Sequence, residues 1–179
     1  MNTSFIEITP FDIEKNTFTQ IGKDGMLVTA KKDDSVNTMT ASWGGLGVMW
    51  NKNVAYVVIR PQRYTKEFVD SSDNFSLTFF DKEFKDKLMY LGTVSGRDED
   101  KISKCQLTTS YENNIPYFEE ANLVLFCKKL FTTDYKEENF IDKEIMSKNY
   151  PNKDYHTLYI AEITKVLAKQ LRWLTIDKQ

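Results

Sequence analysis

The apolar positions in the first half of the chain follow the periods of strands. Val54–Ile59 reads V-A-Y-V-V-I, a continuous apolar run suited to a strand that is covered on both faces. Phe75–Phe80 alternates, with Phe and Leu on one side and Ser and Thr on the other. Four more strands are predicted at Met26–Ala30, Asn37–Trp43, Leu123–Phe131 and Thr157–Ile163.

Helical patterns are fewer than strand patterns. They cover Thr65–Ser72, Lys82–Tyr90, Asp98–Cys105 and Phe140–Ser147. Because strands outnumber helices and are separated mostly by short helices and loops, the pattern favours a curled or closed antiparallel sheet over a doubly wound βαβ fold. The predicted fold class is mainly β with helical excursions.

Composition limits the class of protein. The 179 residues are expected to form one domain, residues 1–179, and 41% hydrophobic with 13% aromatic residues suffice for a real core. A net charge of −2 gives no excess of positive charge of the kind that binds nucleic acid or an anionic membrane. No apolar run approaches the roughly 20 residues that span a bilayer, so we expect a soluble protein.

Cysteine and histidine are scarce. Cys105 and Cys127 lie far apart and Met1–Pro10 is not a basic, apolar leader, so no secreted disulfide framework is expected and the protein is predicted to be cytoplasmic. The single histidine, His156, excludes His-pair zinc motifs, and no metal site is expected. His156 and the two cysteines are interpreted as structural residues.

Two arginines follow the most apolar strand. Arg60 and Arg63 precede a predicted helix that has Thr65 as its N-cap residue and Tyr64 packed onto Val69. A helix N-terminus with two guanidinium groups beside it is suited to a phosphate or a carboxylate. The alternative is a capped helix with solvated arginines.

A second charged loop, Ser95–Lys101, reads S-G-R-D-E-D-K. Asp98 is the predicted N-cap residue of the next helix, and the acidic residues after it suit the first turn. The loop can also present Ser95, Arg97 and Lys101 to an anion. The alternative is that the charges form a solvated face.

Small and hydroxylic residues lead into a glycine-rich segment at Asn37–Gly44. They leave backbone groups open to a flat partner, with Trp43 as an aromatic wall. The alternative is an edge strand with Trp43 and Trp50 in the core. The glycines cluster at Gly44–Gly47 and Gly92–Gly96, and these clusters are interpreted as turns or as ligand loops.

The chain lacks the usual catalytic motifs. It has no G-x-G-x-x-G after a strand, no G-x-x-x-x-G-K-[ST] loop, no G-x-S-x-G elbow and no H-E-x-x-H. It also has no convincing set of Ser or Cys with His and an acid, so no catalytic residue is assigned. If the protein is an enzyme, the simplest interpretation of this lack, together with the candidate anion-receptor loops, is that a cofactor carries out the chemistry and the protein holds it.

Four motifs together resemble one family. N-T-M-T-A-S-W-G-G at Asn37–Gly45, V-I-R-P-Q-R-Y-T at Val58–Thr65, S-G-R-D-x-D-K at Ser95–Lys101 and Y-I-A-E-I at Tyr159–Ile163 are similar, in order and spacing, to the flavin reductase-like, FMN-binding split-barrel proteins. That family includes flavoredoxin-type members. The resemblance implies a six-stranded antiparallel split barrel, a homodimer with FMN near the subunit interface, and electron transfer through the flavin.

The resemblance also assigns roles by position. The isoalloxazine ring would lie along Met39, Thr40, Ala41, Ser42 and Trp43, with backbone N–H groups facing its polar edge. The FMN phosphate or ribityl chain would be bound by Arg60, Arg63, Tyr64 and Thr65. The other side of that pocket would be closed by Ser95, Gly96, Arg97 and Lys101.

The implied activity is that of an FMN-dependent flavin reductase, which passes electrons from NAD(P)H to an acceptor. Two alternatives stay open: a flavoredoxin-like electron carrier reduced by a redox partner protein, and a non-catalytic module that binds flavin or haem. The hydrophilic stretch Glu137–Asp154 matches no motif and is interpreted as a lid or a partner surface. Leu171–Gln179 is expected to dock on another surface, such as a second subunit.

Overall fold

The computed structural model describes residues 5–169. In chain order, its elements are β1 Phe5–Ile8, η1 Pro10–Asp12, η2 Phe18–Asp24, β2 Met26–Lys32, β3 Ser35–Ala41, β4 Gly44–Met49, β5 Lys52–Ile59, α1 Tyr64–Ser71, β6 Asn74–Phe79, η3 Lys82–Phe84, α2 Lys85–Thr93, α3 Lys101–Lys104, β7 Thr109–Glu112, β8 Ile115–Phe118, β9 Leu123–Asp134, η4 Glu137–Asn139, α4 Lys143–Asn149 and β10 Thr157–Lys169.

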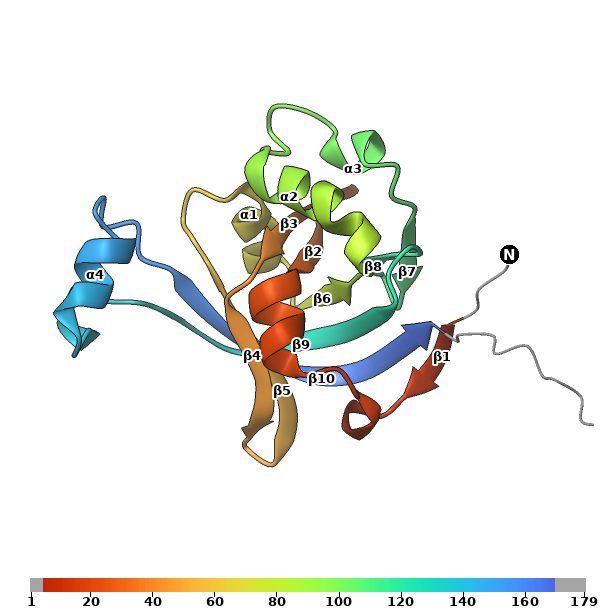
Figure 1. Cartoon of the computed structure of the whole chain (residues 1–179), viewed down its shortest axis with the longest axis horizontal. Coiled ribbons are helices and arrows are strands. Elements are labelled where there is room, and N and C mark those ends of the chain that lie inside the picture. Colours follow the sequence, from red (N-terminus) through yellow and green to blue (C-terminus); the bar gives the residue numbers. More distant parts are fainter. Residues whose placement is uncertain (1–4, 170–179) are drawn as a thin grey trace, which may run out of the picture.

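An eight-stranded antiparallel sheet forms the body of the molecule (Figure 1). The six strands predicted from the sequence stand next to one another in it, in the order β3-β2-β6-β9-β10-β5. β3 and β5, at the two ends of this run, contact each other, so the sheet curls towards closure. β4 pairs with the outer edge of β5, and β1 pairs with β10. The predicted mainly-β, antiparallel class is confirmed.

Alternate positions of neighbouring strands fill the barrel. Val28, Leu77 and Leu125 lie in register on β2, β6 and β9, and all three are fully buried. On the other face of the sheet, Leu91 of α2 and Phe118 of β8 belong to a second buried cluster. Each fully buried side chain of this kind contributes about 1.5–3 kcal/mol, so the two clusters give the strands a rigid frame.

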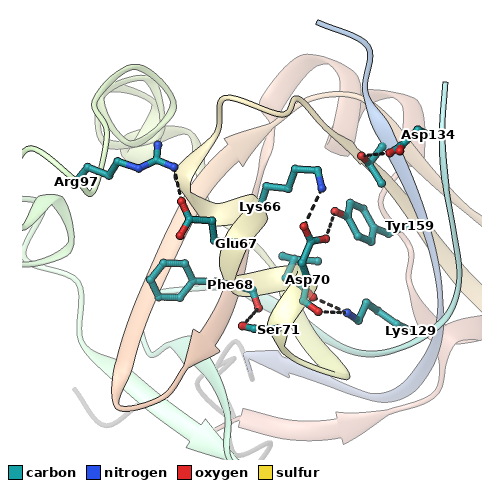
Figure 2. A network of polar contacts seen from close by, with 11 residues as sticks. Lys66, Glu67, Phe68, Asp70, Ser71, Arg97, Lys129, Asp134 and Tyr159 are labelled. Carbon is teal, nitrogen blue, oxygen red and sulfur yellow. Dashed lines mark hydrogen bonds and ion pairs between the residues drawn. The ribbon is translucent and has the colours of Figure 1, made fainter. Parts of the chain in front are cut away.

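A polar network fixes α1 against the barrel (Figure 2). The Asp70 carboxylate accepts hydrogen bonds from the Tyr159 hydroxyl and from Lys66 Nζ, the latter at 2.7 Å. Lys129 Nζ donates to the carbonyl oxygen of Val69 at 2.6 Å, which satisfies a free carbonyl at the end of the helix. The C-terminal end of α1 is thereby held against β9 and β10.

The glycine-rich segment is a strand, not the turn or loop predicted for it. Gly44 and Gly45 lie in β4, opposite Val57 and Tyr56 of β5. The Tyr56 side chain lies across Gly45, where a Cβ atom would be 2.3 Å from the hydroxyl oxygen. The glycines therefore serve a close approach between two strands.

Replacing Gly44 with alanine is expected to lower the free energy of unfolding by about 1–3 kcal/mol, the usual cost of overpacking. The reason is that the new Cβ would lie 2.3 Å from the Tyr56 carbonyl oxygen, a backbone atom that cannot move aside. Gly47→Ala is the matched control, because a Cβ at Gly47 in the same strand meets nothing within 4 Å. Urea unfolding of both variants measures the difference, and equal losses would contradict the steric argument.

Residues 135–156, called the excursion below, leave the barrel between β9 and β10 and project from it (Figure 1). The excursion carries η4 and α4 and has its own aromatic cluster, in which the rings of Tyr150 and Tyr155 lie 5.2 Å apart. The predicted helix at Phe140–Ser147 begins later, because the Asp142 side chain accepts the Glu144 N–H at 2.9 Å and caps α4.

Leu171–Gln179, the predicted docking segment, lies outside the described residues. Within residues 5–169, no helix is long and apolar enough to cross a membrane.

Candidate functional site

An open cavity of about 350 Å³, called the main cavity below, lies where β3 and β5 end. Its volume falls within the range of small-molecule and cofactor sites. It is lined by Met39, Thr40, Ala41, Ser42, Trp43, Val58, Arg60, Gln62, Arg63 and His156. The segment predicted to receive a flat ligand thus shares one cavity with both predicted anion-binding arginines.

β3 offers its backbone to the main cavity more than its side chains. The strand stands at one end of the sheet and pairs only with β2, so half of its backbone groups are open on the other edge. The side chains of Met39 and Ala41 belong to the barrel core. The Thr40 hydroxyl donates to the Leu88 carbonyl oxygen on α2. A flat molecule beside this strand would meet amide groups, which suits a ring with a polar edge.

A smaller cavity of about 120 Å³, the side cavity, shares Met39, Gln62 and Arg63 with the main cavity. The rest of its lining comprises Tyr64, Thr65, Thr93, Val94, Ser95 and Lys101. The two separate loops predicted to bind anions therefore meet around Arg63.

Arg63 is a cation without a counter-charge. Its side chain makes no ion pair and no hydrogen bond with any residue in the described part of the chain. Burial, and then the nearby charge of Arg60, lower the pKa of Arg63. A guanidinium group in this position is ready to bind an oxyanion.

Lys101 is a second cation in the side cavity and is only 3% exposed. Its Nζ donates to the carbonyl oxygens of Leu91 and Val94 at the end of α2, both at 2.9 Å. It has no carboxylate partner among residues 5–169. Burial, and then the charge of Arg63, lower the pKa of Lys101 to about 8. A bound anion would offset both the desolvation and the repulsion between the two cations.

The start of α1 differs from its prediction. The N-cap residue is Arg63 and not Thr65, which lies in the first turn and is 1% exposed. A turn in which the Arg63 N–H donates to the Arg60 carbonyl at 3.1 Å begins the helix earlier. The Thr65 hydroxyl accepts a hydrogen bond from Asn37 Nδ2 at 3.0 Å, so it links α1 to β3.

The helix after the second loop, by contrast, starts later than predicted. Asp100, not Asp98, is its N-cap residue, since the Asp100 carboxylate accepts the Ser103 N–H at 3.1 Å. The resulting α3 covers only Lys101–Lys104.

Gly96 and Arg97 line neither cavity. A Cβ atom on Gly96 would lie 2.3 Å from Asn37 Oδ1, so the glycine lets the loop pack on β3. The Arg97 guanidinium lies 4.5 Å from the centre of the Tyr64 ring and pairs with Glu67 (Figure 2). Arg97 therefore has partners within the protein and supports the start of α1 from outside.

Arg60 lines the main cavity, but its guanidinium is bound by the excursion. It forms an ion pair with Asp154, and Nη2 donates to the Asn149 carbonyl oxygen at 2.8 Å. The same group lies 5.0 Å from the centre of the Tyr150 ring. Arg60 thus fixes the return of the excursion at the mouth of the cavity.

Val58, Gln62 and His156 line the main cavity and are absent from the residues predicted for the site. His156 is 7% exposed, and burial, followed by the charge of Arg60, lowers its pKa to about 4, against the opposing effect of Asp154. Pairing of Thr157 with Ile59 places His156 beside the end of β5. Strand pairing is the signal that could have found it.

The aromatic wall is present, but it is not buried. The Trp43 ring lies 5.2 Å from the His156 ring, and Trp43 is 46% exposed. Trp50, on the β4–β5 hairpin, is 55% exposed. The alternative interpretation of this segment was an edge strand with Trp43 and Trp50 in the core. β3 is an edge strand, but both tryptophans are exposed, so that part of the alternative is wrong.

The sequence matches the family model for the flavin reductase like domain over residues 19–172. A comparison with curated protein sequences finds no match.

Solved structures share the fold at low sequence identity. The FMN-binding domain of a flavin reductase-like enzyme from Shewanella baltica OS155 has a TM-score of 0.69 and 17% identity, covering 94% of this chain and 79% of that chain. Flavoredoxin from Methanosarcina acetivorans has a TM-score of 0.66 and 21% identity, with 82% and 69% covered. Flavoredoxin of Desulfovibrio vulgaris (Miyazaki F) has a TM-score of 0.63 and 20% identity, with the same coverage. The predicted split-barrel fold is confirmed.

Proposed function

Because this chain belongs to the flavin reductase-like domain family, we propose that its two adjoining cavities bind FMN. The isoalloxazine ring lies in the main cavity along β3, and the phosphate lies in the side cavity between Arg63 and Lys101. The observation that carries this proposal is the pair of cations without a carboxylate partner among residues 5–169, next to an open strand edge.

The charges fit a phosphate. A phosphate monoester carries about −1.5 to −2 charge at neutral pH, close to the combined charge of Arg63 and Lys101. Each hydrogen bond to a charged group contributes about 1.5–3 kcal/mol, so two or three such contacts can hold the coenzyme without a covalent link. Ser95, which lines the same cavity, adds a hydroxyl donor.

The open edge of β3 fits the ring. Backbone N–H groups beside Met39–Ala41 can donate to the polar edge of a flat heterocycle, and Trp43 bounds the main cavity on one side. When bound, FMN supplies hydride and electron transfer, and the residues of this chain bind it, orient it and shield it from water.

The proposed reaction is oxidation of NAD(P)H and transfer of the electrons to an acceptor. The chain has no Rossmann fingerprint, which would indicate a dedicated dinucleotide-binding fold. The nicotinamide is therefore a transient ligand of the open main cavity. The flavoredoxin-like alternative uses the same cofactor but receives electrons from a redox partner protein.

The cytoplasmic location stays a prediction from the sequence.

Anaerobic stopped-flow mixing tests the reaction. FMN-loaded protein is mixed with NADH or NADPH, and the absorbance of oxidised flavin is followed. We expect bleaching by at least one nucleotide. Bleaching by dithionite alone supports the electron carrier instead, and failure to take up FMN leaves the non-catalytic module.

We also propose a homodimer that uses the β4–β5 hairpin. Val48 and Trp50 on this hairpin are 72% and 55% exposed, and the Trp50 ring lies 6.3 Å from that of Phe131, which is 45% exposed. Exposed apolar side chains on one hairpin, with neighbouring exposed aromatic rings, are typical of an interface.

Trp50→Glu is expected to dissociate the dimer at micromolar concentration, because a central tryptophan typically contributes about 2 kcal/mol or more to an interface. Tyr111→Glu, at a similarly exposed position on β7, is the control that should leave the dimer intact. Sedimentation velocity distinguishes the species, and a monomeric native protein would refute the proposal.

A further inference from the structure

We propose that Tyr150 is a positioning residue that fixes His156 with its proton on Nε2, so that the main cavity presents a neutral N–H donor to a carbonyl oxygen. The carbonyl belongs to the small molecule that exchanges electrons with the flavin. This inference rests on the proposed function for its ligand, but not for the arrangement of the two side chains.

The contact between the two residues is short and buried. The Tyr150 hydroxyl oxygen lies 2.7 Å from His156 Nδ1, and the two side chains are 4% and 7% exposed. The hydroxyl has no other hydrogen-bond partner among residues 5–169. If Nδ1 carried the proton, the tyrosine hydrogen would have no acceptor, whereas donation from Tyr150 to Nδ1 satisfies both groups. The proton of the imidazole is then on Nε2.

Nε2 is the nitrogen left for a ligand. His156 lines the main cavity beside Trp43, and Nε2 has no hydrogen-bond partner in the described part of the chain. Buried donors are normally paired, so an unpaired N–H at a cavity wall is suited to an acceptor on a bound molecule.

The excursion delivers Tyr150 to this position. Its backbone N–H bonds to the Met146 carbonyl at 2.9 Å and ends α4. The Arg60 guanidinium covers its ring at 5.0 Å and binds the neighbouring carbonyl of Asn149. Asp154, in turn, accepts hydrogen bonds from Arg60 and, at 2.8 Å, from Gln62 Nε2. Arg60 and Gln62, which follow β5, therefore hold the part of the excursion that contacts His156.

The surroundings keep the donor uncharged. Burial and the charge of Arg60 oppose protonation of His156, Asp154 favours it, and the Tyr135 ring, 6.4 Å away, adds no charge at neutral pH. With a pKa of about 4, His156 is a neutral imidazole at physiological pH. A neutral N–H donor matches an uncharged carbonyl, such as that of a carboxamide or a quinone, better than it matches an anion.

The first test reads the tautomer directly. His156 is the single histidine of the chain, so protein labelled with ¹⁵N-histidine gives one imidazole whose two nitrogen shifts report which one is protonated. The full chain without FMN is measured, which keeps the result independent of flavin binding. We expect the Nε2–H form in the native protein and a mixture of tautomers in Tyr150→Phe. Tyr135→Phe, which removes a nearby hydroxyl that makes no hydrogen bond to His156 among residues 5–169, is the matched control and should leave the Nε2–H form.

The second test reads the consequence in FMN-loaded protein. Tyr150→Phe is expected to slow one half-reaction about 5- to 20-fold, in line with a weakened hydrogen bond. If reduction by NADH is slower, the carbonyl that accepts the His156 N–H is that of the nicotinamide carboxamide. If reoxidation by menadione is slower, it is a carbonyl of the electron acceptor. An Nδ1–H imidazole in the native protein, or a tautomer unchanged in Tyr150→Phe, would overturn the positioning role. A changed tautomer with both half-reactions unaffected would overturn the donor role, whereas absent FMN uptake would refute only the proposed function.

Discussion

Replacing Arg63 with alanine is expected to weaken FMN binding by about 10- to 100-fold. The guanidinium lies between the main and side cavities and has no carboxylate partner among residues 5–169, so its donors are available to the phosphate. Loss of a charged hydrogen-bonding partner costs about 1.5–3 kcal/mol, and each 1.4 kcal/mol corresponds to a tenfold change in Kd. Removal of Arg63 also relieves its repulsion of Lys101. The loss of FMN binding free energy is therefore smaller than that of two full charged hydrogen bonds.

Quenching of flavin fluorescence measures this effect. Arg97→Ala is the matched control, since it removes the same charge from the adjoining loop, where the guanidinium already pairs with Glu67 and stacks on Tyr64. We expect the affinity of the control to stay within about threefold of the native value, as is usual for exposed charge pairs. An equal loss in both variants would indicate a general effect of net charge, and an unchanged Arg63→Ala would place the phosphate elsewhere.

FMN affinity is expected to fall by up to tenfold per pH unit above about pH 8. The phosphate dianion binds the protonated form of Lys101, whose pKa in the free protein is lowered to about 8. Binding of an anion raises that pKa, so the complex is fully stabilised below pH 8 and loses affinity as Lys101 deprotonates in the free protein. The phosphate itself does not reverse this trend, because its second pKa of about 6 lies below the range.

Titrations between about pH 6.5 and 9.5 at constant ionic strength test this dependence. Lys101→Gln keeps amide hydrogens for the carbonyls of Leu91 and Val94 but removes the titrating charge. Its affinity should be lower than that of the native protein at pH 7 and nearly flat across the range. A native profile without a decline above pH 8, or the same decline in Lys101→Gln, would show that another group controls binding.

Local patterns were sufficient to predict the six barrel strands. Most of them read as a short apolar or alternating run, and Asn37–Trp43 is rich in Thr, Ser and Met. Each overlaps a strand of the structure, although β9 and β10 extend beyond their predicted ends. β4 was missed because three of its six residues are glycine, which have low strand propensity and no side chain to form a pattern. β4 is paired with β5, and Tyr56 of β5 covers Gly45; neither contact can be recognised from the residues of β4 alone.

The candidate site shows the same division between local and distant information. The loops around Arg63 and Lys101 are recognisable from residue type, and the fold brings them together. The partner of Arg60 could not be foreseen, because Asp154 lies 94 positions further along the chain in a segment without a motif. His156 was interpreted as structural, since a lone histidine before a strand carries no signal until β10 is paired with β5.

The most direct measurement compares FMN with riboflavin, which lacks only the phosphate, in parallel titrations of the native protein. If the phosphate lies between Arg63 and Lys101, FMN should bind at least about 100-fold more tightly, as two charged contacts require. Equal affinities for the two flavins would contradict the assignment of the side cavity as the phosphate site.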